Sequence, residues 1–436
     1  MNNTVKRLLC AALAALLCLS FAACSLQEEE EPFATVNGTA IADDDFDYLY
    51  DYYVSMFSAY GYDITSDAEY LESFKSDLLD TLIQEEVILQ KAVELGYREE
   101  TDELLAEAEE DFEATYEEYL DYYYYDLAVE ELGEDATEEE LRARMDEMFE
   151  EEAAEIGESY QTTHDDYIQS FLDNSAYQAL RDSVVSTVTV EEDEVQAYYD
   201  EQLEAQTEEI TETPYYYEYY AEGYYDTPAL YVPEGYRYVT QILIGFEENE
   251  ELESQMEELQ DEIDSLNEAE EPDTDEIEAL QAEYDALFEE YSASAKEKAD
   301  EVLERLAAGE SFEDLQAEFN EDEGSNEGGA YYETGYLVGP ESTGYVEGFV
   351  TGAMTLENVG DVTTEAYEST YGYHILKLVS LVTPGAVPYE EVRDELEPLA
   401  LAEKQNEAWN DQVEAWVAEA DVVKNEERLA DYGTVG

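Results

Sequence analysis

Basic residues are scarce in this chain. It has 17 Lys and Arg against 117 Asp and Glu, so its formal net charge is −100. Clustered basic side chains are needed to bind a phosphate backbone, and the sequence therefore excludes nucleic acid as a partner. We interpret the acidity as a solvated surface. A diffuse calcium-binding surface is the alternative, but the sequence contains no Asp-x-Asp-x-Asp-Gly loop that would localise an ion.

Histidine and cysteine are scarce as well. With 2 histidines, the chain is too poor in imidazole for a histidine-rich metal site or a conventional Ser-His-Asp triad, and it has no phosphate-cradling glycine loop. We therefore expect no metal and no cofactor. Two of the 3 cysteines, Cys10 and Cys18, lie in a segment that we expect to be removed, which excludes an internal disulfide.

The first 23 residues have the layout of a signal peptide. Lys6 and Arg7 precede an apolar run, residues 8–19, that is short for a transmembrane helix. Phe-Ala-Ala then precedes Cys24, which resembles the bacterial lipobox, where the chain is cut before the cysteine and acylated on its sulfur. We expect a lipoprotein anchored through Cys24 at the outer face of the bacterial cytoplasmic membrane. An ordinary secretory signal is the alternative.

The chain continues with an acidic tether, residues 24–32, a strand hairpin and a series of helices. Asn37-Gly38 separates two short β-type runs and tolerates the positive φ angles of a two-residue turn. Residues 67–95 carry an apolar stripe at helical spacing and are followed by Gly96, a typical helix end. Helices are also predicted from residue 43 onward and over 101–132, 137–156, 163–184 and 189–202.

Tyrosine dominates the aromatic residues, at 40 against 13 Phe. Residues 205–234 are rich in tyrosine and proline without a sustained period, so we expect a linker or an irregular insert there. Residues 122–125 are four consecutive tyrosines, and on a helix some of these rings must face solvent. Half-buried replacement of Phe and Leu is one interpretation of this tyrosine content, and an adaptable surface for unfolded polypeptides is the other.

Residues 247–292 predict an antiparallel coiled-coil hairpin. Apolar residues recur there at alternating steps of four and three on both sides of Pro272-Asp273. This arm is either a grip for unfolded polypeptides or a spacer.

A set of motifs follows this hairpin in a fixed order. They are the run 295–306, Gly309-Glu-Ser-Phe, Asn320-Glu-Asp322, Gly328-Gly329 and Tyr371-Gly-Tyr-His374-Ile-Leu-Lys. Together they resemble the parvulin family of peptidyl-prolyl isomerases. The strand of residues 236–246 corresponds to the family's first strand, so the hairpin is inserted between the first strand and the first helix. Counted with this insert, the resemblance covers residues 235–382.

The resemblance implies three polar residues at the site. Asp322 falls where the family has a cysteine or an aspartate beside the substrate carbonyl, and His374 occupies the second of its two central histidine positions. Gln241 occupies the first position, where an amide can both donate to and accept from an imidazole nitrogen.

The resemblance also implies how the chemistry proceeds. Rotation about an X-Pro bond crosses a barrier of about 18 to 20 kcal/mol, which falls when the carbonyl leaves water and the ring lies in an apolar cup. Phe349 and Met354 would line that cup, with Tyr331 nearby. Such a site needs no covalent step.

The N-terminal part is similar to a different domain. Residues 34–46 and 78–89 with Gly96 are similar to the chaperone domain of extracytoplasmic foldases of the PrsA and SurA type, in which a C-terminal helix returns to complete the domain. Residues 387–417 fit that helix. We therefore predict an α+β fold, in which a helical chaperone domain built from N- and C-terminal segments accompanies a small parvulin-like α/β domain with the inserted hairpin. The expected boundaries are 33–204 for the N-terminal chaperone domain and 205–234 for the tyrosine-rich linker. Residues 235–382 are expected to form the parvulin-like domain, and 383–436 the C-terminal helix that returns to the chaperone domain.

Our hypothesis is an anchored foldase. Its helical part would bind unfolded or newly exported polypeptides, and its parvulin-like part would accelerate prolyl isomerisation in them. A holdase whose parvulin fold has lost catalysis together with the first histidine is one alternative, and an envelope-assembly or adhesion lipoprotein is another. The sequence leaves the client proteins and the oligomeric state open.

Overall fold

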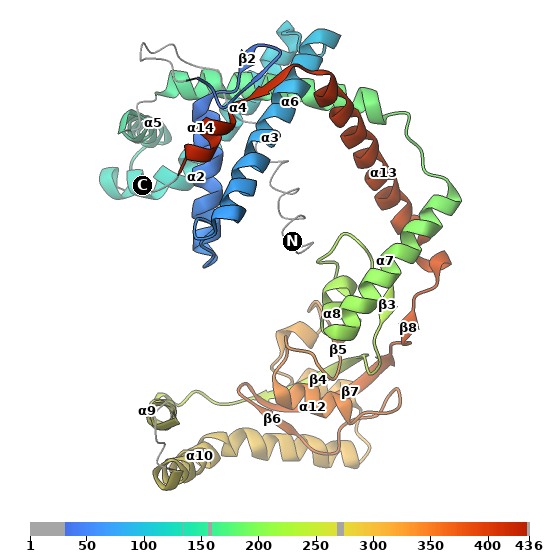
Figure 1. Cartoon of the computed structure of the whole chain (residues 1–436). Coiled ribbons are helices and arrows are strands. Elements are labelled where there is room, and N and C mark those ends of the chain that lie inside the picture. Colours follow the sequence, from blue (N-terminus) through green and yellow to red (C-terminus); the bar gives the residue numbers. More distant parts are fainter. Residues whose placement is uncertain (1–30, 134, 156–158, 268–273, 434–436) are drawn as a thin grey trace. The chain divides into compact units, whose positions relative to one another are not determined.

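The computed structural model describes residues 31–133, 135–155, 159–267 and 274–433. Contacts divide the chain into two compact units, one made of residues up to Thr189 together with those from Glu403 onward, and the other of Val190–Ala402. Helices predominate in both, with small antiparallel sheets among them (Figure 1), which confirms the predicted α+β class. Within the described ranges, no helix has both the length and the hydrophobicity needed to cross a bilayer. The predicted signal peptide and Cys24 lie outside those ranges.

The first unit joins the two ends of the described chain in one sheet. Strands β1 (Ala34–Val36) and β2 (Thr39–Ala40) form the predicted hairpin, in which Asn37 and Gly38 have φ angles of 50° and 87°. Strand β9 (Val422–Lys424) pairs antiparallel with the other edge of β1. The C-terminal segment is therefore part of the same sheet as the N-terminal hairpin.

Helices α2 (Asp43–Ala59), α3 (Ala68–Leu95) and α14 (Glu426–Asp431) pack with this sheet. The Asp67 side chain caps α3 by accepting from the backbone N–H groups of Glu69 and Tyr70, and Gly96 ends it with φ 80°. Lys75 of α3 is buried, and its Nζ donates to the carbonyl oxygens of Ala430 and Tyr432 at 3.1 and 2.8 Å. This contact fixes the C-terminal helix against α3.

Helices α4 (Asp102–Leu132), α5 (Glu138–Glu155) and α6 (Tyr160–Val185) enclose a second core in this unit. Phe112, Tyr116, Leu120 and Tyr124 face it from successive turns of α4. Among the four consecutive tyrosines, only Tyr124 is buried, because a helix directs four successive side chains to different sides. The remaining three rings are exposed, as the sequence indicated.

The second unit begins with α7 (Glu192–Glu212), α8 (Tyr216–Ala221) and the two-stranded sheet of β3 (Tyr231–Val232) and β8 (Gly385–Ala386). The expectation of irregular structure over 205–234 is wrong for the parts in α7 and α8. Helix α7 continues nearly three turns beyond the predicted end at residue 202, with Gln206 and Ile210 buried. Tyr217 of α8 is buried against Tyr236. These contacts join residues distant in sequence, which local periodicity does not reveal.

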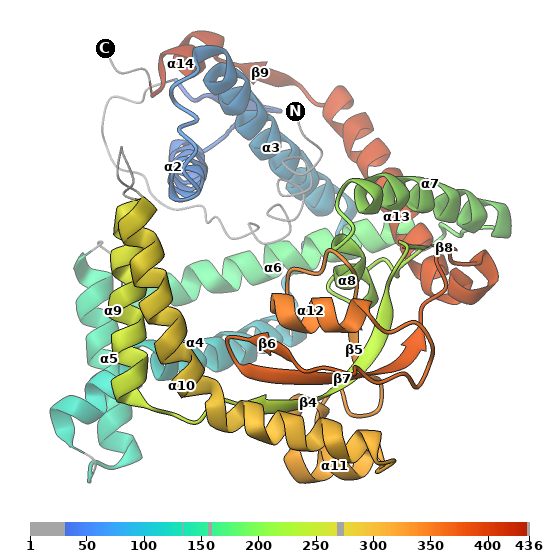
Figure 2. The ribbon, with the colours of Figure 1, turned by 90° about the horizontal axis from the view of Figure 1, so that it is seen from below.

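A four-stranded sheet lies at the centre of this unit. It has the order β5 (Tyr336–Val338), β4 (Arg237–Gly245), β7 (Gly372–Leu381) and β6 (Tyr367–Ser369), with every neighbouring pair antiparallel. Figure 2 shows α12 (Glu347–Met354) over one face and α10 (Thr274–Ala307) with α11 (Phe312–Phe319) over the other. Side chains alternate along β4 and β7, so Val239 and Leu376 pack under α12 while Ile242 and Ile375 pack under α10 and α11.

The inserted arm consists of α9 (Glu250–Asn267) and the first half of α10. Met256 and Ile263 of α9 are buried, and the Tyr291 hydroxyl of α10 donates to Glu253 at 2.8 Å. The predicted second arm helix and the predicted first parvulin helix are one continuous helix of 34 residues. The coiled-coil character of the arm stays a prediction.

The second unit also contains the first part of α13 (Tyr389–Glu419), which starts at Tyr389 and passes into the first unit after Ala402. Val392, Leu396 and Ala400 of this helix pack with Val195 and Tyr199 of α7.

Candidate functional site

Two neighbouring strands bring Gln241 and His374 together. Leu243 of β4 is paired with His374 of β7, and Gln241 is paired with Leu376, so both polar side chains lie on the face under α12. The amide oxygen of Gln241 is 2.7 Å from Nδ1 of His374. Both side chains are buried, with exposed fractions of 6% and 3%.

Asp322 completes this network from the loop that follows α11. It is the N-cap of a short 3₁₀ turn, η1 (Glu323–Ser325). Its Oδ2 accepts hydrogen bonds from Gln241 Nε2, Ser325 Oγ and the Tyr336 hydroxyl at 2.8, 2.7 and 2.7 Å, and its Oδ1 accepts one from the backbone N–H of Gly324 at 3.0 Å. Four donors thus converge on one carboxylate.

The network fixes the tautomer of His374. An ionised carboxylate only accepts hydrogen bonds, so the NH₂ group of Gln241 faces Asp322 and its oxygen faces His374. Nδ1 must then carry the ring proton. The other nitrogen, Nε2, accepts from the hydroxyl of Ser369, which lies 2.6 Å away.

Burial sets the charges of the site. Desolvation lowers the pKa of His374 to about 4, although the charge of Asp322 opposes this shift. Burial also disfavours the charged form of Asp322, but the hydrogen bonds from Ser325, Gln241 and Tyr336 outweigh it and hold the pKa of this carboxyl below its usual value. At neutral pH the site therefore holds a neutral imidazole and a carboxylate.

Aromatic rings surround the histidine. Phe349 of α12 meets the His374 ring edge to face at 5.7 Å, and Tyr345 stacks on Phe349 at 5.1 Å. Tyr336 contacts Phe349 at 5.7 Å and Tyr331 at 4.3 Å. These rings form an aromatic cluster from the His374 ring to the exposed side chain of Tyr331.

The structure thus places the candidate residues in a single region. Gln241, Asp322 and His374 form one hydrogen-bonded chain, Phe349 is buried beside it, and Met354 lies half-buried in the same core as Phe349. Tyr331 reaches this region through Tyr336. The sequence did not point to four further residues, namely Ser325, Tyr336, Tyr345 and Ser369.

Asn320 and Gly329 fix the loop that carries Asp322. Asn320 accepts from the backbone N–H of Leu243 at 2.7 Å and donates to the carbonyl of Asp322 at 2.9 Å. Gly329 allows the loop to close, because a Cβ at this position would lie 2.3 Å from the carbonyl oxygen of Glu323. Close backbone approach therefore explains Gly329, and a φ of 92° explains Gly328.

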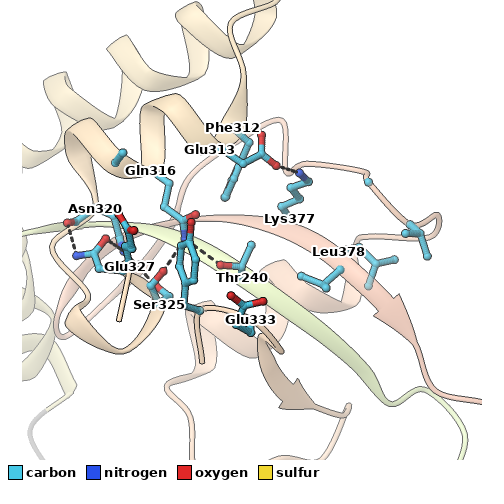
Figure 3. Close-up of a pocket in the computed structure, with 16 residues that line it drawn as sticks. Thr240, Phe312, Glu313, Gln316, Asn320, Ser325, Glu327, Glu333, Lys377 and Leu378 are labelled. Atoms are coloured by element: carbon cyan, nitrogen blue, oxygen red, sulfur yellow. Dashed lines mark hydrogen bonds and ion pairs between the residues drawn. The ribbon is translucent and has the colours of Figure 1, made fainter. Parts of the chain in front are cut away.

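A cavity of about 770 Å³ lies on the opposite face of the sheet, between α11, β7 and the loop of residues 325–333 (Figure 3). Gln316 of α11 donates there to Thr240 Oγ1 and to the carbonyl of Ser325, and Glu313 pairs with Lys377. Gln241, Asp322 and His374 do not line it. This cavity borders the loop of residues 325–333 and is separate from the aromatic cluster.

Comparison with known families matches this architecture. Residues 1–121 match the SurA-like N-terminal domain, and residues 282–380 match the PPIC-type PPIase domain. The chain therefore carries a SurA-like N-terminal domain and a PPIC-type PPIase domain, as the sequence motifs implied.

The relatives found by sequence are PrsA foldases. Foldase protein PrsA 1 of Bacillus cereus is 30% identical over 135 residues, which cover 30% of this chain and 44% of the relative. Foldase protein PrsA of Halalkalibacterium halodurans is 35% identical over 112 residues, covering 25% of this chain and 29% of the relative. The chain thus matches less than half the length of these relatives.

Solved structures of the same kind are similar at low identity. PrsA from Bacillus subtilis shares 19% identity over 76% of this chain and 90% of that one, with a TM-score of 0.21. One of two structurally related SurA-like chaperones of Campylobacter jejuni shares 17% identity over 90% of this chain and 98% of that one, with a TM-score of 0.26.

Proposed function

We propose that this chain is a lipid-anchored extracytoplasmic foldase that binds unfolded exported polypeptides and catalyses cis–trans isomerisation of X-Pro bonds in them. The observation that carries the proposal is the hydrogen-bonded chain Asp322–Gln241–His374 beside Phe349, within a PPIC-type domain. The SurA-like domain and the PrsA foldase relatives support the chaperone half of the proposal.

The polar groups of the site are suited to a reaction that breaks no covalent bond. Nδ1 of His374 donates to Gln241 while Nε2 accepts from Ser369, so the ring has no free nitrogen with which to move a proton. The carboxylate of Asp322 already accepts from four donors. These groups form a rigid, preorganised polar floor beneath the aromatic rings.

The aromatic rings supply the environment that the rotation needs. A proline ring packed against Phe349 and Met354 leaves water, and its preceding carbonyl is desolvated at the same time. Amide resonance weakens in such surroundings, because the charge-separated form is less stable away from water. Gln241 serves this mechanism as well as a histidine would, since the floor only needs a group that donates to Asp322 and accepts from His374.

An isomerisation assay on a short X-Pro peptide tests the proposal. The wild type should exceed the uncatalysed rate, His374→Ala and Asp322→Ala should each lose most of that activity, and Glu304→Gln, on the opposite face of the sheet, should retain it. A wild-type rate equal to the uncatalysed rate would rule out the enzymatic function.

A holdase without isomerase activity is the second candidate. Tyr122, Tyr123 and Tyr125 on α4 are exposed, with fractions of 80%, 56% and 46%, and they favour direct binding of unfolded polypeptides by the first unit. Suppression of aggregation of an unrelated unfolded protein, compared between wild type and a variant with all three residues changed to Ser, tests this role. Absence of suppression by the wild type would favour a role in envelope assembly or adhesion instead.

The lipid anchor rests on the sequence around Cys24. Mass spectrometry of protein from the membrane fraction should find an acylated N-terminal cysteine after removal of 23 residues, and Cys24→Ser should release the protein from the membrane. A mature N-terminus at any other residue contradicts the anchor.

A further inference from the structure

Helix α8 packs along the edge of the sheet that carries the aromatic cluster. The ring of Tyr217 meets Tyr236 at 4.8 Å with an interplanar angle of 78°, and Tyr236 is 1% exposed. Both share a buried cluster with Leu337 of β5, the edge strand. The tyrosine-rich segment around α8 is thereby held beside the strand that leads to the site.

Glu218 of α8 fastens the next loop to this helix. Its carboxylate accepts from the Tyr236 hydroxyl at 3.0 Å and from the Ser342 hydroxyl at 2.5 Å. Ser342 lies in the loop between β5 and α12, and three residues later the same loop carries Tyr345, whose ring stacks on Phe349. A short series of direct contacts therefore joins α8 to the rings beside His374.

The surface that α8 adds is aromatic and acidic. Tyr219, Tyr224 and Tyr225 are exposed, with fractions of 40%, 70% and 40%, and Tyr219 contacts both of the others at 5.7 and 6.4 Å. Glu222 is exposed beside them. Burial raises the pKa of Tyr345, and the carboxylates of Glu222 and Glu218 raise it further, which is consistent with their lying near its hydroxyl.

Basic residues are missing from both segments that build this surface. Residues 214–226 and 331–349 contain no Lys and no Arg. Exposed tyrosine faces next to carboxylates attract a cation through two additive effects, the ring quadrupole and the Coulomb term. An acidic residue at the same place would meet only repulsion.

We propose that residues 215–226 and the loop of residues 339–346 form an extended substrate-binding surface beside the proline cup, which selects polypeptide segments carrying Lys or Arg close to the proline. This inference rests on the proposed function, because it names the class of X-Pro substrate that the isomerase prefers. The surface acts by orienting the flanking residues of the substrate, and it leaves the polar floor of the site unchanged.

The test is a set of short peptides that share one X-Pro bond and differ in a single residue near it, placed as Lys, Gln or Glu on either side. Wild type should have the highest kcat/KM for a Lys peptide and the lowest for the matching Glu peptide. Glu222→Gln should reduce the Lys-to-Glu ratio by about two- to fivefold, the range measured for exposed charge pairs. The preference should also shrink as salt is raised from 0.01 to 0.5 M, since screening shortens the reach of the carboxylates.

Controls separate this inference from the proposed function. Glu304→Gln removes the same charge from an exposed position on α10, over the other sheet face, and should leave the ratio unchanged. Tyr224→Ala should weaken binding of the Lys peptide, measured by fluorescence anisotropy without any turnover, while Tyr224→Phe should bind it as the wild type does. Equal kcat/KM for Lys and Glu peptides in an active enzyme overturns the extended surface alone, whereas an inactive wild type overturns the isomerase proposal.

Discussion

The carboxylate of Asp322 and the ring of His374 are joined through a single side chain, the amide of Gln241. Its Nε2 donates to Asp322 at 2.8 Å and its Oε1 accepts from His374 at 2.7 Å. The NH₂ group of the amide can only donate and its oxygen can only accept, so the direction of both hydrogen bonds is fixed. Substitutions of Gln241 therefore test the network directly.

Gln241→Glu keeps the shape of the side chain but replaces the donor to Asp322 by a carboxylate. Two buried like charges then face each other, and we expect the free energy of unfolding to fall by about 2 kcal/mol at pH 7. The loss should be smaller at pH 5, where the new carboxyl is protonated and can donate again. Chemical denaturation at the two pH values measures both effects, and an equal loss at both would contradict the assigned direction of the amide.

Stability of the second unit should depend on pH through His374. Its folded pKa of about 4 lies below the ordinary value of 6.5, so the unfolded chain binds more protons between these values. This contribution is fully present above pH 6.5 and is lost as pH falls toward 4. The difference in unfolding free energy between wild type and His374→Asn should therefore change by up to about 3 kcal/mol over this range. A difference that stays constant from pH 7 to 4 would show that the ring is not desolvated.

The first unit should show the opposite dependence. Burial raises the pKa of Glu85 to about 7, with a further contribution from Asp45, and burial together with Asp44 and Glu86 raises the pKa of Asp45 to about 6. The folded state holds these protons more tightly, so the stabilisation is present below pH 4 and is lost as pH rises through 6 to 7.

Glu85→Gln removes the carboxyl group with the higher of these two pKa values. At pH 8 the variant should be more stable than wild type by about 2 kcal/mol, after allowance for screening at a partly exposed site. The matched variant Glu94→Gln, near the end of the same helix, should change stability little. Thermal unfolding at pH 5 and 8 is the measurement, and a stabilisation that is equal at both pH values would contradict the shifted pKa.

Lys75→Met tests the contact that holds the C-terminal helix. Met keeps most of the apolar stem but leaves the carbonyl oxygens of Ala430 and Tyr432 without their donor, so we expect a loss of about 1 to 3 kcal/mol. Limited proteolysis should then release the last residues sooner than in wild type. Lys91→Met, which removes only a surface pair with Glu94, serves as the control and should behave as wild type. Unchanged proteolysis in Lys75→Met would show that other contacts suffice.

Gly329→Ala tests the closed loop around Asp322. The new methyl group would press on the carbonyl oxygens of Glu323 and Gly324, at 2.3 and 2.4 Å, and should displace the 3₁₀ turn. We expect isomerase activity to fall at least tenfold with a smaller loss of stability. Gly344→Ala has open space at its Cβ and should be nearly neutral in stability. Full activity in Gly329→Ala would mean that the loop can move without affecting the site.

The sequence named the residues that meet at the centre of the candidate site, but not those around them. The motifs around Gln241 and His374 lie on strands, and the family resemblance implied that these strands are neighbours. The sequence did not indicate the hydrogen bonds of Ser369 and Tyr336, because they depend on the pairing of β6 and β5 with the central strands. The role of residues 205–234 was missed for a related reason, since Tyr217 is buried only by contact with Tyr236 and the sheet edge.

Helix α10 forms part of the arm with its first half and covers one face of the four-stranded sheet with its second half. Its residues Ala295, Ala299 and Val302 pack against β4 and β7 on the sheet face opposite α12. The same uninterrupted helix begins at Thr274, beside α9. Each residue of a helix advances the side chains by about 100°. Adding or deleting one residue between positions 275 and 290 would therefore rotate the paired α9 by that angle about the axis of α10. Length changes in this arm are thus confined to whole turns if its facing is to be kept.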